Sequence, residues 1–292
     1  MSAFPTPILP YHQAAYPAID PTRPALSTAG KSILITGGGT GIGAETALSF
    51  AKSGASHLAL VGRRPTTLQT TASKITALYP STKVHVIPGD MTSLESITSA
   101  LSTFAGAVPS GKIDVLVACA GYMDKVALFD DTDPADWWRT FEINVKGNYN
   151  LLRAFGAVGA DDAVVLHVST TIAHQAYVPR FSAYQSSKLA AIKVFDHWAR
   201  EHPGRRVVHY HPGLIVTDIG VAADEAELGL QYDDISLPGA FAVWAASPEA
   251  DFLNGRFVFA HWDVDTLKSK EVREELEADP QKFTIVLKGW PH

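Results

Sequence analysis

Tyr184 and Lys188 are the side chains whose types and spacing suggest chemistry. They lie in a segment with helical spacing over residues 183–201, so their four-residue separation places them on one face, with Cβ atoms roughly 5–6 Å apart. That face continues with apolar residues, as the buried side of a helix does: Ala191, Ile192, Phe195 and Ala199. An ammonium beside a phenol lowers the pKa of the phenol and suits it to proton transfer. The same spacing also fits a polar pair at the edge of a core, so other residues must decide.

Composition and charge describe an ordinary soluble protein. Of the 292 residues, 46% are hydrophobic and 18% charged, and this length can build a sizeable core. The net charge of −6, with no block of Lys or Arg, argues against nucleic acid as a partner. No window approaches 18 uninterrupted apolar residues, and no signal peptide is recognisable, so we expect no membrane association. The single cysteine, Cys119, excludes an intrachain disulfide and fits a reducing compartment, which predicts a cytoplasmic protein.

Short apolar runs alternate with longer segments of helical spacing from residue 30 onward. The runs are apolar at consecutive positions, as strands covered on both faces must be: 32–36, 57–62, 83–88, 112–118, 163–169, 206–211 and 256–260. Helical spacing marks the intervening segments 44–52, 134–155 and 183–201. This alternation predicts an α/β fold, a Rossmann-type, doubly wound, seven-stranded parallel sheet with helices on both faces. Residues 30–292 show no repeat and no change of composition, so we expect a single domain.

Residues 1–29 differ because prolines punctuate them: Pro5, Pro7, Pro10, Pro17, Pro21 and Pro24. This spacing prevents a helix or a central strand. We expect an N-terminal arm that is extended and either lies on the surface or is mobile.

A glycine cluster connects the first predicted strand to the first predicted helix, which is expected to begin near Ile42. Residues 36–43 read Thr-Gly-Gly-Gly-Thr-Gly-Ile-Gly. Glycines there let the chain turn sharply, let backbone amides approach a pyrophosphate and let the helix pack close to the sheet. The predicted dinucleotide contacts in this loop are Gly37, Gly39, Thr40, Gly41, Ile42 and Gly43. A glycine-rich turn without a ligand is the alternative.

The end of the second predicted strand bears on the choice of cofactor. About 20 residues after the glycine loop, an NAD enzyme places Asp or Glu for the ribose 2′-hydroxyl. Here the strand ends in Gly62, Arg63 and Arg64, with glycine where that acid would stand. Two arginines pair well with a 2′-phosphate, so we predict NADP(H); solvated turn residues would give the same pattern.

The order of motifs resembles that of the short-chain dehydrogenase/reductase family over about residues 30–262. The loop at 36–43 has the family's Thr-Gly-x-x-x-Gly-Ile-Gly spacing. Asp90 follows the third strand, where the family's aspartate contacts adenine, and Asn144 begins Asn-Val-Lys-Gly in the fourth helix.

The later motifs continue in the family's order. Tyr184 and Lys188 follow the fifth strand, and residues 212–217, Pro-Gly-Leu-Ile-Val-Thr, follow the sixth. Residues 262–265, Trp-Asp-Val-Asp, and the proline-rich arm are similar to fungal members linked to secondary metabolism.

This resemblance implies a role for each matched residue. It makes Tyr184 the proton donor and Lys188 the group that lowers its pKa and holds the nicotinamide ribose. Asn144 would anchor a water that links Lys188 to solvent. The Ile215 backbone would bind the carboxamide and Thr217 the pyrophosphate. The further implied cofactor contacts are Asp90, Met91, Ala120, Gly121, Asn144, Tyr184, Lys188, Pro212 and Gly213.

The family's assisting serine is replaced by threonine in this chain. That serine hydrogen-bonds the substrate oxygen about 13 or 14 residues before the tyrosine, where this chain has Thr171 and Thr170. Ser169 precedes them and is expected to end the strand. Alignment with fungal relatives favours Thr170. Threonine keeps the hydroxyl but adds a methyl group and stiffens χ1, so we expect retained activity in a tighter pocket, with a poorly held oxyanion as the alternative.

Two further segments depart from the family or vary within it. Residues 118–121 read Ala-Cys-Ala-Gly where relatives usually read Asn-Asn-Ala-Gly, and Cys119 is interpreted as a small buried hydrophobe. Residues 218–236 are predicted to form a substrate loop, long enough to act as a mobile lid. Its Leu228, Leu230 and Tyr232 either line a pocket or pack the loop.

The chain's partners follow from the same residues. A second apolar stripe on the Tyr184 helix, which includes Val194 and Trp198, favours a homodimer or homotetramer, as in the family; a loop could also cover it. The histidines lack a helical pair or a cysteine cluster, so we expect no metal.

The function predicted from the sequence is NADPH-dependent reduction of a ketone or aldehyde, a small-molecule substrate. A related enzyme that uses the cofactor as a scaffold for dehydration, isomerisation or cyclisation is one alternative. A protein that senses NADP(H) without turnover is the other.

Overall fold

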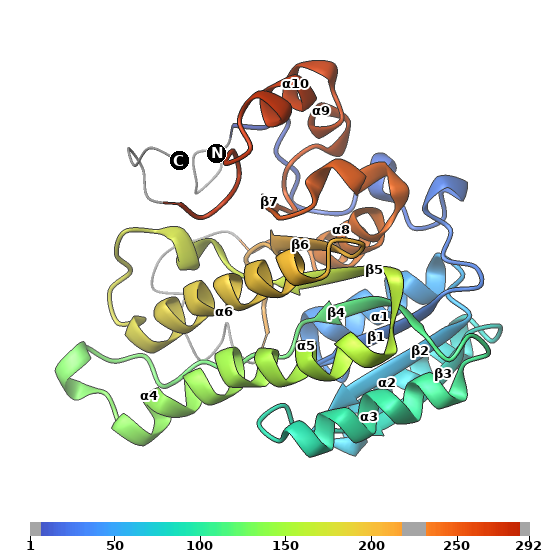
Figure 1. The fold of residues 1–292 in the computed structure, drawn as a ribbon, viewed down its shortest axis with the longest axis horizontal. Helices are drawn as coiled ribbons and strands as arrows, with labels where there is room; N and C mark the ends of the chain where they lie inside the picture. The colour runs from blue at the N-terminus through green and yellow to red at the C-terminus, as the bar shows by residue number, and fades with distance from the viewer. Residues whose placement is uncertain (1–6, 218–231, 287–292) are drawn as a thin grey trace.

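Seven parallel strands form one sheet in residues 7–217 and 232–286, the part of the chain that this computed structural model describes (Figure 1). Their order across the sheet is β3-β2-β1-β4-β5-β6-β7. The strands are β1 (Ser32–Thr36), β2 (His57–Gly62), β3 (Lys83–Pro88), β4 (Ile113–Ala118), β5 (Gly159–Val168), β6 (Arg206–His211) and β7 (Arg256–Phe259). The predicted α/β class and parallel sheet are confirmed.

The strand order reverses beside β1, which positions the functional site. The chain runs outward from β1 to β3, and β4 then returns to the other side of β1. Thr36 ends β1 and Ala118 ends β4, and the two residues are paired in register. In open parallel sheets, ligands bind in the crevice at the carboxyl ends of the strands at such a switch point.

Helices cover both faces because consecutive strand residues point to opposite sides of the sheet. Ile33 and Ile35 pack on one face, and Leu34 between them packs on the other. The first face carries α1 (Gly41–Lys52), α2 (Pro65–Leu78) and α8 (Ser236–Ala246), and the second carries α3 (Leu94–Ala107), α5 (Gly147–Val158) and α6 (Ser182–Glu201) (Figure 1). Burial on both sides explains why the inner strands read as continuous apolar runs, whereas the edge strand β3 is mostly half-buried or exposed.

The helix predicted over residues 134–155 is divided into three parts. α4 (Pro134–Phe141) passes into a π-helical turn, η4 (Glu142–Lys146), before the chain continues as α5. The side chain of Asn148 donates a hydrogen bond to the carbonyl oxygen of Asn144 at 2.6 Å, which supplies a partner where the helix widens. Such π turns are frequent at functional sites, and Asn144 lies in the middle of this one.

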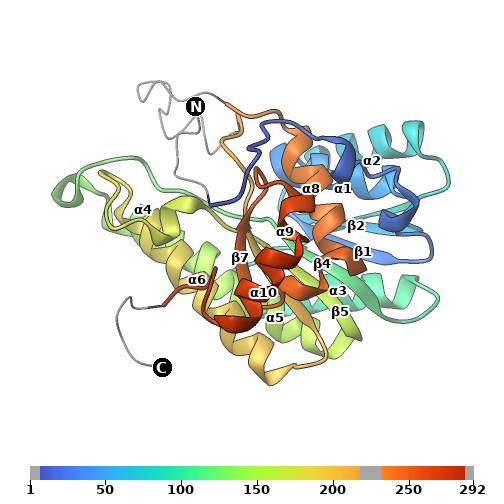
Figure 2. The ribbon, with the colours of Figure 1, turned by 90° about the horizontal axis from the view of Figure 1, so that it is seen from above.

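The N-terminal arm packs against elements from the end of the chain. Ile8, Ile19 and Leu26 are 3%, 0% and 1% exposed, so the arm contributes to the core. Figure 2 shows the arm beside α8 and α9 (Val264–Leu267). The short elements η1 (Pro17–Ile19) and η2 (Pro24–Leu26) each begin at a proline, whose fixed φ suits the first position of a helical turn.

The remaining elements of the described residues are η3 (Phe129–Asp131), η5 (Thr171–His174), η7 (Pro248–Leu253) and α10 (Lys270–Ala278). Across the described ranges, no helix combines the length and apolar character needed to cross a membrane.

Candidate active site

A cavity of about 220 Å³ opens at the carboxyl ends of β1, β2 and β4. Its lining includes most of the residues predicted to contact a dinucleotide: Gly37, Gly39, Thr40, Gly41, Ile42, Gly43, Arg63, Arg64, Asp90, Met91, Ala120, Gly121 and Thr217. The structure therefore brings the glycine loop, the two arginines and Asp90 together around one space.

Glycine is required at two positions of this loop. Gly41 has a φ of +53°, in the left-handed region that favours glycine. A Cβ on Gly43 would lie 2.3 Å from the carbonyl oxygen of Gly37, so only glycine lets the first turn of α1 approach the loop this closely. The amides at the start of α1 lie beside the cavity, where unpaired N–H groups and the helix dipole favour an anion. This cradle fits the pyrophosphate of a dinucleotide.

The side of this cavity formed by β2 and β3 carries charge. Arg63 and Arg64 are both exposed and both line the cavity. Asp90 accepts hydrogen bonds from the backbone amide and the hydroxyl of Thr92, each at 2.9 Å. The backbone bond, with smaller contributions from the Thr92 hydroxyl and the nearby Arg63 charge, lowers the pKa of Asp90.

A second cavity, of about 230 Å³, adjoins the first, because Ile42, Cys119, Gly121 and Thr217 line both. Except for Asn144, it holds the other predicted residues: Thr170, Thr171, Tyr184, Lys188, Pro212, Gly213 and Ile215. Its lining also includes residues that were not assigned from the sequence: Met123, Val168, Ser169, Ile172, Gln175, Val178, Phe181, His211 and Leu214. Several of these lie directly between the fifth strand and Tyr184, and that position between two motifs was the only available signal.

Tyr184 and Lys188 lie in the first two turns of α6 at the wall of the second cavity. Lys188 is 6% exposed, and its Nζ lies 5.7 Å from the centre of the Tyr184 ring. The structure therefore brings the ammonium and the phenol together, as the four-residue spacing suggests.

Burial sets the protonation behaviour of Lys188 and its neighbour Cys119. It lowers the pKa of Lys188 from 10.5 to about 8. It also raises the pKa of the Cys119 thiol to about 12, although the Lys188 charge acts in the opposite direction. Because the thiol keeps its proton at neutral pH, it gives Lys188 no charged partner and is not a ready nucleophile. Cys119 therefore acts as a small side chain in the wall of both cavities.

Asn144 braces the loop after β4 against α6. Its Oδ1 accepts a hydrogen bond from the Tyr122 amide at 2.9 Å, and its Nδ2 donates to the Tyr122 carbonyl at 2.7 Å and to Ser187 Oγ at 3.0 Å. Among the described residues around the two cavities, Asn144 lines neither. It nevertheless lies near Lys188, because a Cβ on Gly121 would meet Lys188 Nζ at 3.5 Å and Asn144 Oδ1 at 3.6 Å.

Three hydroxyl groups follow one another at the end of β5, and all three residues line the second cavity. Thr170 Oγ1 accepts a hydrogen bond from the Ile172 amide at 3.3 Å, which caps η5. Thr171 Oγ1 lies 3.5 Å from His174 Nε2. Ser169 Oγ is buried and has no hydrogen-bond partner in the part of the chain that the structure describes. The sequence predicted only that Ser169 ends the strand, and the structure adds that Ser169 lines the second cavity.

Most of the predicted substrate loop, residues 218–231, lies outside the described residues, and Leu228 and Leu230 with it. Tyr232 is described and is not among the described residues that line the second cavity. Within the described ranges, no three His, Cys, Asp or Glu side chains are grouped in a way that could hold a metal ion.

Comparison with known proteins identifies the family. A family model described as short chain dehydrogenase matches residues 31–228, which is more than half of the chain. The chain belongs to the short-chain dehydrogenase/reductase family, and the resemblance noted from the motifs is confirmed.

Similar proteins extend this match over almost the whole chain. A short chain dehydrogenase/reductase of Claviceps purpurea is 37% identical, with 98% of this chain and 95% of the relative covered. One of Aspergillus aculeatus is 34% identical, with 98% of each covered.

Solved structures agree on the fold. A short-chain type dehydrogenase/reductase of Mycobacterium ulcerans is 26% identical with a TM-score of 0.74, over 80% of this chain and 89% of that one. A short chain dehydrogenase of Burkholderia cenocepacia, solved in complex with NADP, is 25% identical with a TM-score of 0.72, over 82% and 99%.

Proposed function

We propose that this protein is an NADPH-dependent reductase that converts a ketone or aldehyde into an alcohol, with Tyr184 as the proton donor. The observation that carries the proposal is the junction of the two cavities. The glycine loop and Arg63 line one, Tyr184 and Lys188 line the other, and the two adjoin. A nicotinamide cofactor held by the first cavity would supply the hydride.

The proton would come from Tyr184. Reduction of a carbonyl develops negative charge on its oxygen, and a free tyrosine, with a pKa of about 10, donates a proton too slowly at neutral pH. Lys188 corrects this, because its ammonium is charged below a pH of about 8 and stabilises the phenolate that remains. Thr170 would donate a hydrogen bond to the same carbonyl oxygen, and Thr171 is the alternative donor.

The preference for NADP(H) rests on the end of β2. Arg63 and Arg64 present two positive charges to the first cavity, and Gly62 introduces no carboxylate that would repel a 2′-phosphate. The NADP complex of the Burkholderia cenocepacia dehydrogenase supports this choice.

The apolar lining of the second cavity, with Met123, Ile172, Val178 and Phe181, favours a hydrophobic carbonyl compound. The fungal relatives and the resemblance of the arm favour a role in secondary metabolism. The single cysteine favours a cytoplasmic protein.

We further propose a homodimer or homotetramer. The stripe that suggested this from the sequence is not available, because Val194 and Trp198 pack into the core of the protein itself. Exposed apolar side chains lie instead on other parts of the helices α4, α5 and α6. Trp138 on α4, Tyr149 on α5 and Leu189 on α6 are 59%, 49% and 38% exposed.

The test is NADPH consumption, followed by absorbance, against a panel of aliphatic, aromatic and polycyclic ketones. Tyr184→Phe should lower kcat by roughly 10²–10⁴-fold while the Kd for NADPH, measured by fluorescence titration, changes little. Carbonyl reduction that survives this substitution would refute the role of Tyr184. Dehydration, isomerisation or cyclisation without NADPH consumption would favour a scaffold role for the cofactor, and binding without any turnover would favour a sensor.

A further inference from the structure

Asp233 and His261 form a buried contact beside the segment that follows β6. His261 Nε2 lies 2.7 Å from Asp233 Oδ2, and the two side chains are 1% and 3% exposed. Both residues lie outside residues 31–228, the stretch that matches the family model. Neither is among the described residues that line the two cavities, so the proposed reaction leaves this pair without a role.

The pair holds the backbone of the cavity wall. Asp233 Oδ2 accepts a hydrogen bond from the Leu214 amide at 2.8 Å, and the Asp233 amide donates to the Leu214 carbonyl at 2.7 Å. Gly213 is packed against the pair: its φ is +103°, and a Cβ there would lie 2.8 Å from Asp233 Oδ2 and 3.3 Å from His261 Nε2. Residues 212–215 all line the second cavity. Asp233 therefore fixes one wall of that cavity from behind.

The geometry defines which atoms carry the protons. A carboxylate can only accept hydrogen bonds, so His261 donates through its Nε2–H and Leu214 through its backbone N–H, both to Oδ2 of Asp233. One carboxylate oxygen thus joins the histidine to the cavity wall. Loss of either donor leaves Oδ2 of Asp233 with one hydrogen bond instead of two.

Residues 11–13 of the N-terminal arm contact Asp233 and His261, although they lie more than 200 residues earlier in the chain. The ring of Tyr11 stacks on His261, with centroids 4.4 Å apart and planes 12° apart. The His12 amide donates to the His261 carbonyl at 2.9 Å. Gln13 Nε2 donates to Asp233 Oδ1 at 3.2 Å, and the Asp234 amide donates to the Gln13 carbonyl at 2.8 Å. Three successive arm residues therefore contact the pair or its direct neighbour.

We propose that Asp233 and His261 are positioning residues for the reaction, and that residues 11–13 of the arm hold them in place. This inference rests on the proposed reductase function. Catalysis depends on holding the substrate within a fraction of an ångström of its productive position, and a wall residue that is held from behind keeps that position. Residues 11–13, which lie outside the family match, then support the cavity wall from behind without touching the substrate.

The first test is Asp233→Asn, which keeps the shape of the side chain. Its remaining oxygen carries no charge, so the hydrogen bonds from the Leu214 amide and His261 become weaker. Its amide nitrogen cannot accept the hydrogen bond that Gln13 Nε2 donates to Oδ1. We expect kcat to fall about tenfold or more, with the KM and Kd for NADPH changed less than about threefold. His261→Leu should act in the same way, whereas His261→Gln keeps a donor and should restore part of the rate.

The second test addresses the arm through Tyr11, whose substitution is mild. Tyr11→Ala removes the stacked ring, and Tyr11→Phe keeps it. We expect Tyr11→Ala to lower kcat, and Tyr11→Phe, which keeps the ring stacked on His261, to lower it much less.

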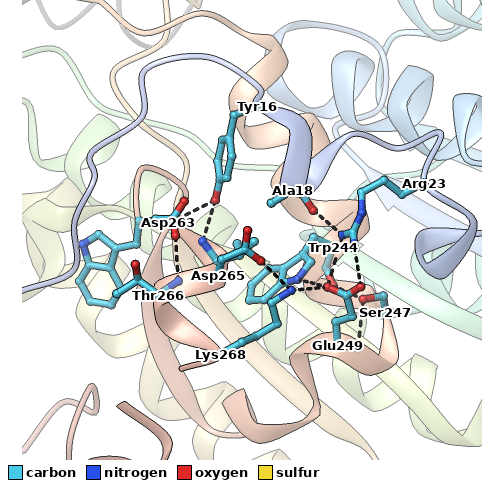
Figure 3. Close-up of polar contacts among 12 residues, drawn as sticks. Tyr16, Ala18, Arg23, Trp244, Ser247, Glu249, Asp263, Asp265, Thr266 and Lys268 are labelled. Atoms are coloured by element: carbon cyan, nitrogen blue, oxygen red, sulfur yellow. Dashed lines mark hydrogen bonds and ion pairs between the residues drawn. The ribbon is translucent and has the colours of Figure 1, made fainter. Parts of the chain in front are cut away.

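A matched control separates this effect from general loosening of the arm. Figure 3 shows a different arm contact, in which Arg23 and Lys268 each pair with Glu249 at 2.8 Å. Glu249→Gln weakens that contact without touching Asp233 or His261. It should lower Tm but leave kcat within about twofold. A loss of kcat equal to that of Tyr11→Ala would overturn the proposal.

Hydrogen–deuterium exchange provides a readout that does not depend on activity. Asp233→Asn and Tyr11→Ala should speed exchange in a peptide that contains Leu214, and not in one that contains residues 37–43. If exchange changes in this way but the unmodified protein reduces no carbonyl, the proposed function fails and the structural link stands. If the unmodified protein is active and both variants keep normal kcat and normal exchange, the positioning role is overturned.

Discussion

Lys188 donates a hydrogen bond from its buried ammonium to the carbonyl oxygen of Val168 at 3.2 Å. Val168 is the last residue of β5, so this bond ties α6 to the strand that leads into the hydroxyl groups of the second cavity. A neutral acceptor compensates only part of the hydration that an ammonium loses on burial, which is why the pKa of Lys188 falls to about 8. The ammonium charge of Lys188 therefore destabilises the folded protein at neutral pH.

Lys188→Met should therefore stabilise the protein and inactivate it. At pH 7 we expect the free energy of unfolding to rise by about 1–3 kcal/mol, and kcat to fall at least about 100-fold. The stability gained by the substitution should shrink between pH 8 and 10.5. In that range Lys188 is largely neutral in the folded protein but still charged in the unfolded chain. The unmodified protein therefore becomes more stable as pH rises, which reduces the difference between the two proteins. Urea titrations at pH 7 and pH 10 measure this, and equal gains at both would contradict it.

Thr170→Ala and Thr171→Ala should differ in their effect on catalysis. If Thr170 hydrogen-bonds the substrate oxygen, its loss should lower kcat by about 10²–10³-fold, whereas Thr171→Ala should change it by less than about threefold. Thr170 also caps η5 at the Ile172 amide, so Thr170→Ala should cost about 1 kcal/mol of stability. Thr170→Ser keeps the hydroxyl and serves as the control. Steady-state kinetics that show no loss in either alanine variant would reject both assignments.

Replacing Arg63 or Arg64 by Ala should weaken the binding of NADPH but not that of NADH. We expect KM for NADPH to rise about tenfold in each, with KM for NADH nearly unchanged, because only NADPH carries the 2′-phosphate. Raising the salt concentration should also raise the KM of the unmodified protein for NADPH, because salt screens the attraction between the arginines and the 2′-phosphate. Arg200, exposed at the end of α6, provides a control through Arg200→Ala. An equal rise in KM for both cofactors would count against a 2′-phosphate contact.

A buried chain of side chains behind the site predicts sensitivity to acid. His167 Nδ1 lies 3.0 Å from His209 Nδ1, and His209 Nε2 lies 3.2 Å from Asp196 Oδ1. His167 also stacks on Phe195. Burial, with smaller contributions from His209 and the Lys188 charge, lowers the pKa of His167 well below 6.5.

The sign of this effect follows from proton binding. Below pH 6.5, His167 is protonated in the unfolded chain but not in the folded protein. As the pH decreases, the free energy of unfolding therefore decreases by up to about 1.4 kcal/mol per pH unit for this group. His167→Phe should keep the stacking and remove that slope between pH 6.5 and 5, while costing about 1–3 kcal/mol at pH 8 because His209 loses a partner. Denaturant titrations across this range give the slope, and an unchanged slope would show that His167 is not responsible.

The sheet was predictable because its signals are local. Strands buried on both faces read as apolar runs, and all seven predicted runs coincide with strands within a few residues at each end. The approach of Tyr184 to Lys188 was predictable for the same reason, since helix geometry alone places residues four apart on one face. The π turn at Asn144 was not, because it leaves the spacing of apolar residues in α4 and α5 largely intact.

The wall of the second cavity could not be read from the sequence. Phe181 and Leu214 belong to segments without regular spacing, and only the packing of the complete sheet brings them to one space. The contact between Gln13 and Asp233 spans 220 residues, and no local pattern indicates it. Long-range contacts of this kind depend on where each element finally lies, which propensity and periodicity do not describe.

The docking of the arm also orders events during synthesis. His12 pairs with Asp263, 251 residues later, and the hydroxyl of Tyr16 accepts a hydrogen bond from the Val264 amide. The arm is synthesised before the segment that it contacts, so His12 and Tyr16 cannot complete these contacts until Asp263 and Val264 have emerged from the ribosome. Closure of this part of the arm must therefore be a late step when the protein folds during synthesis.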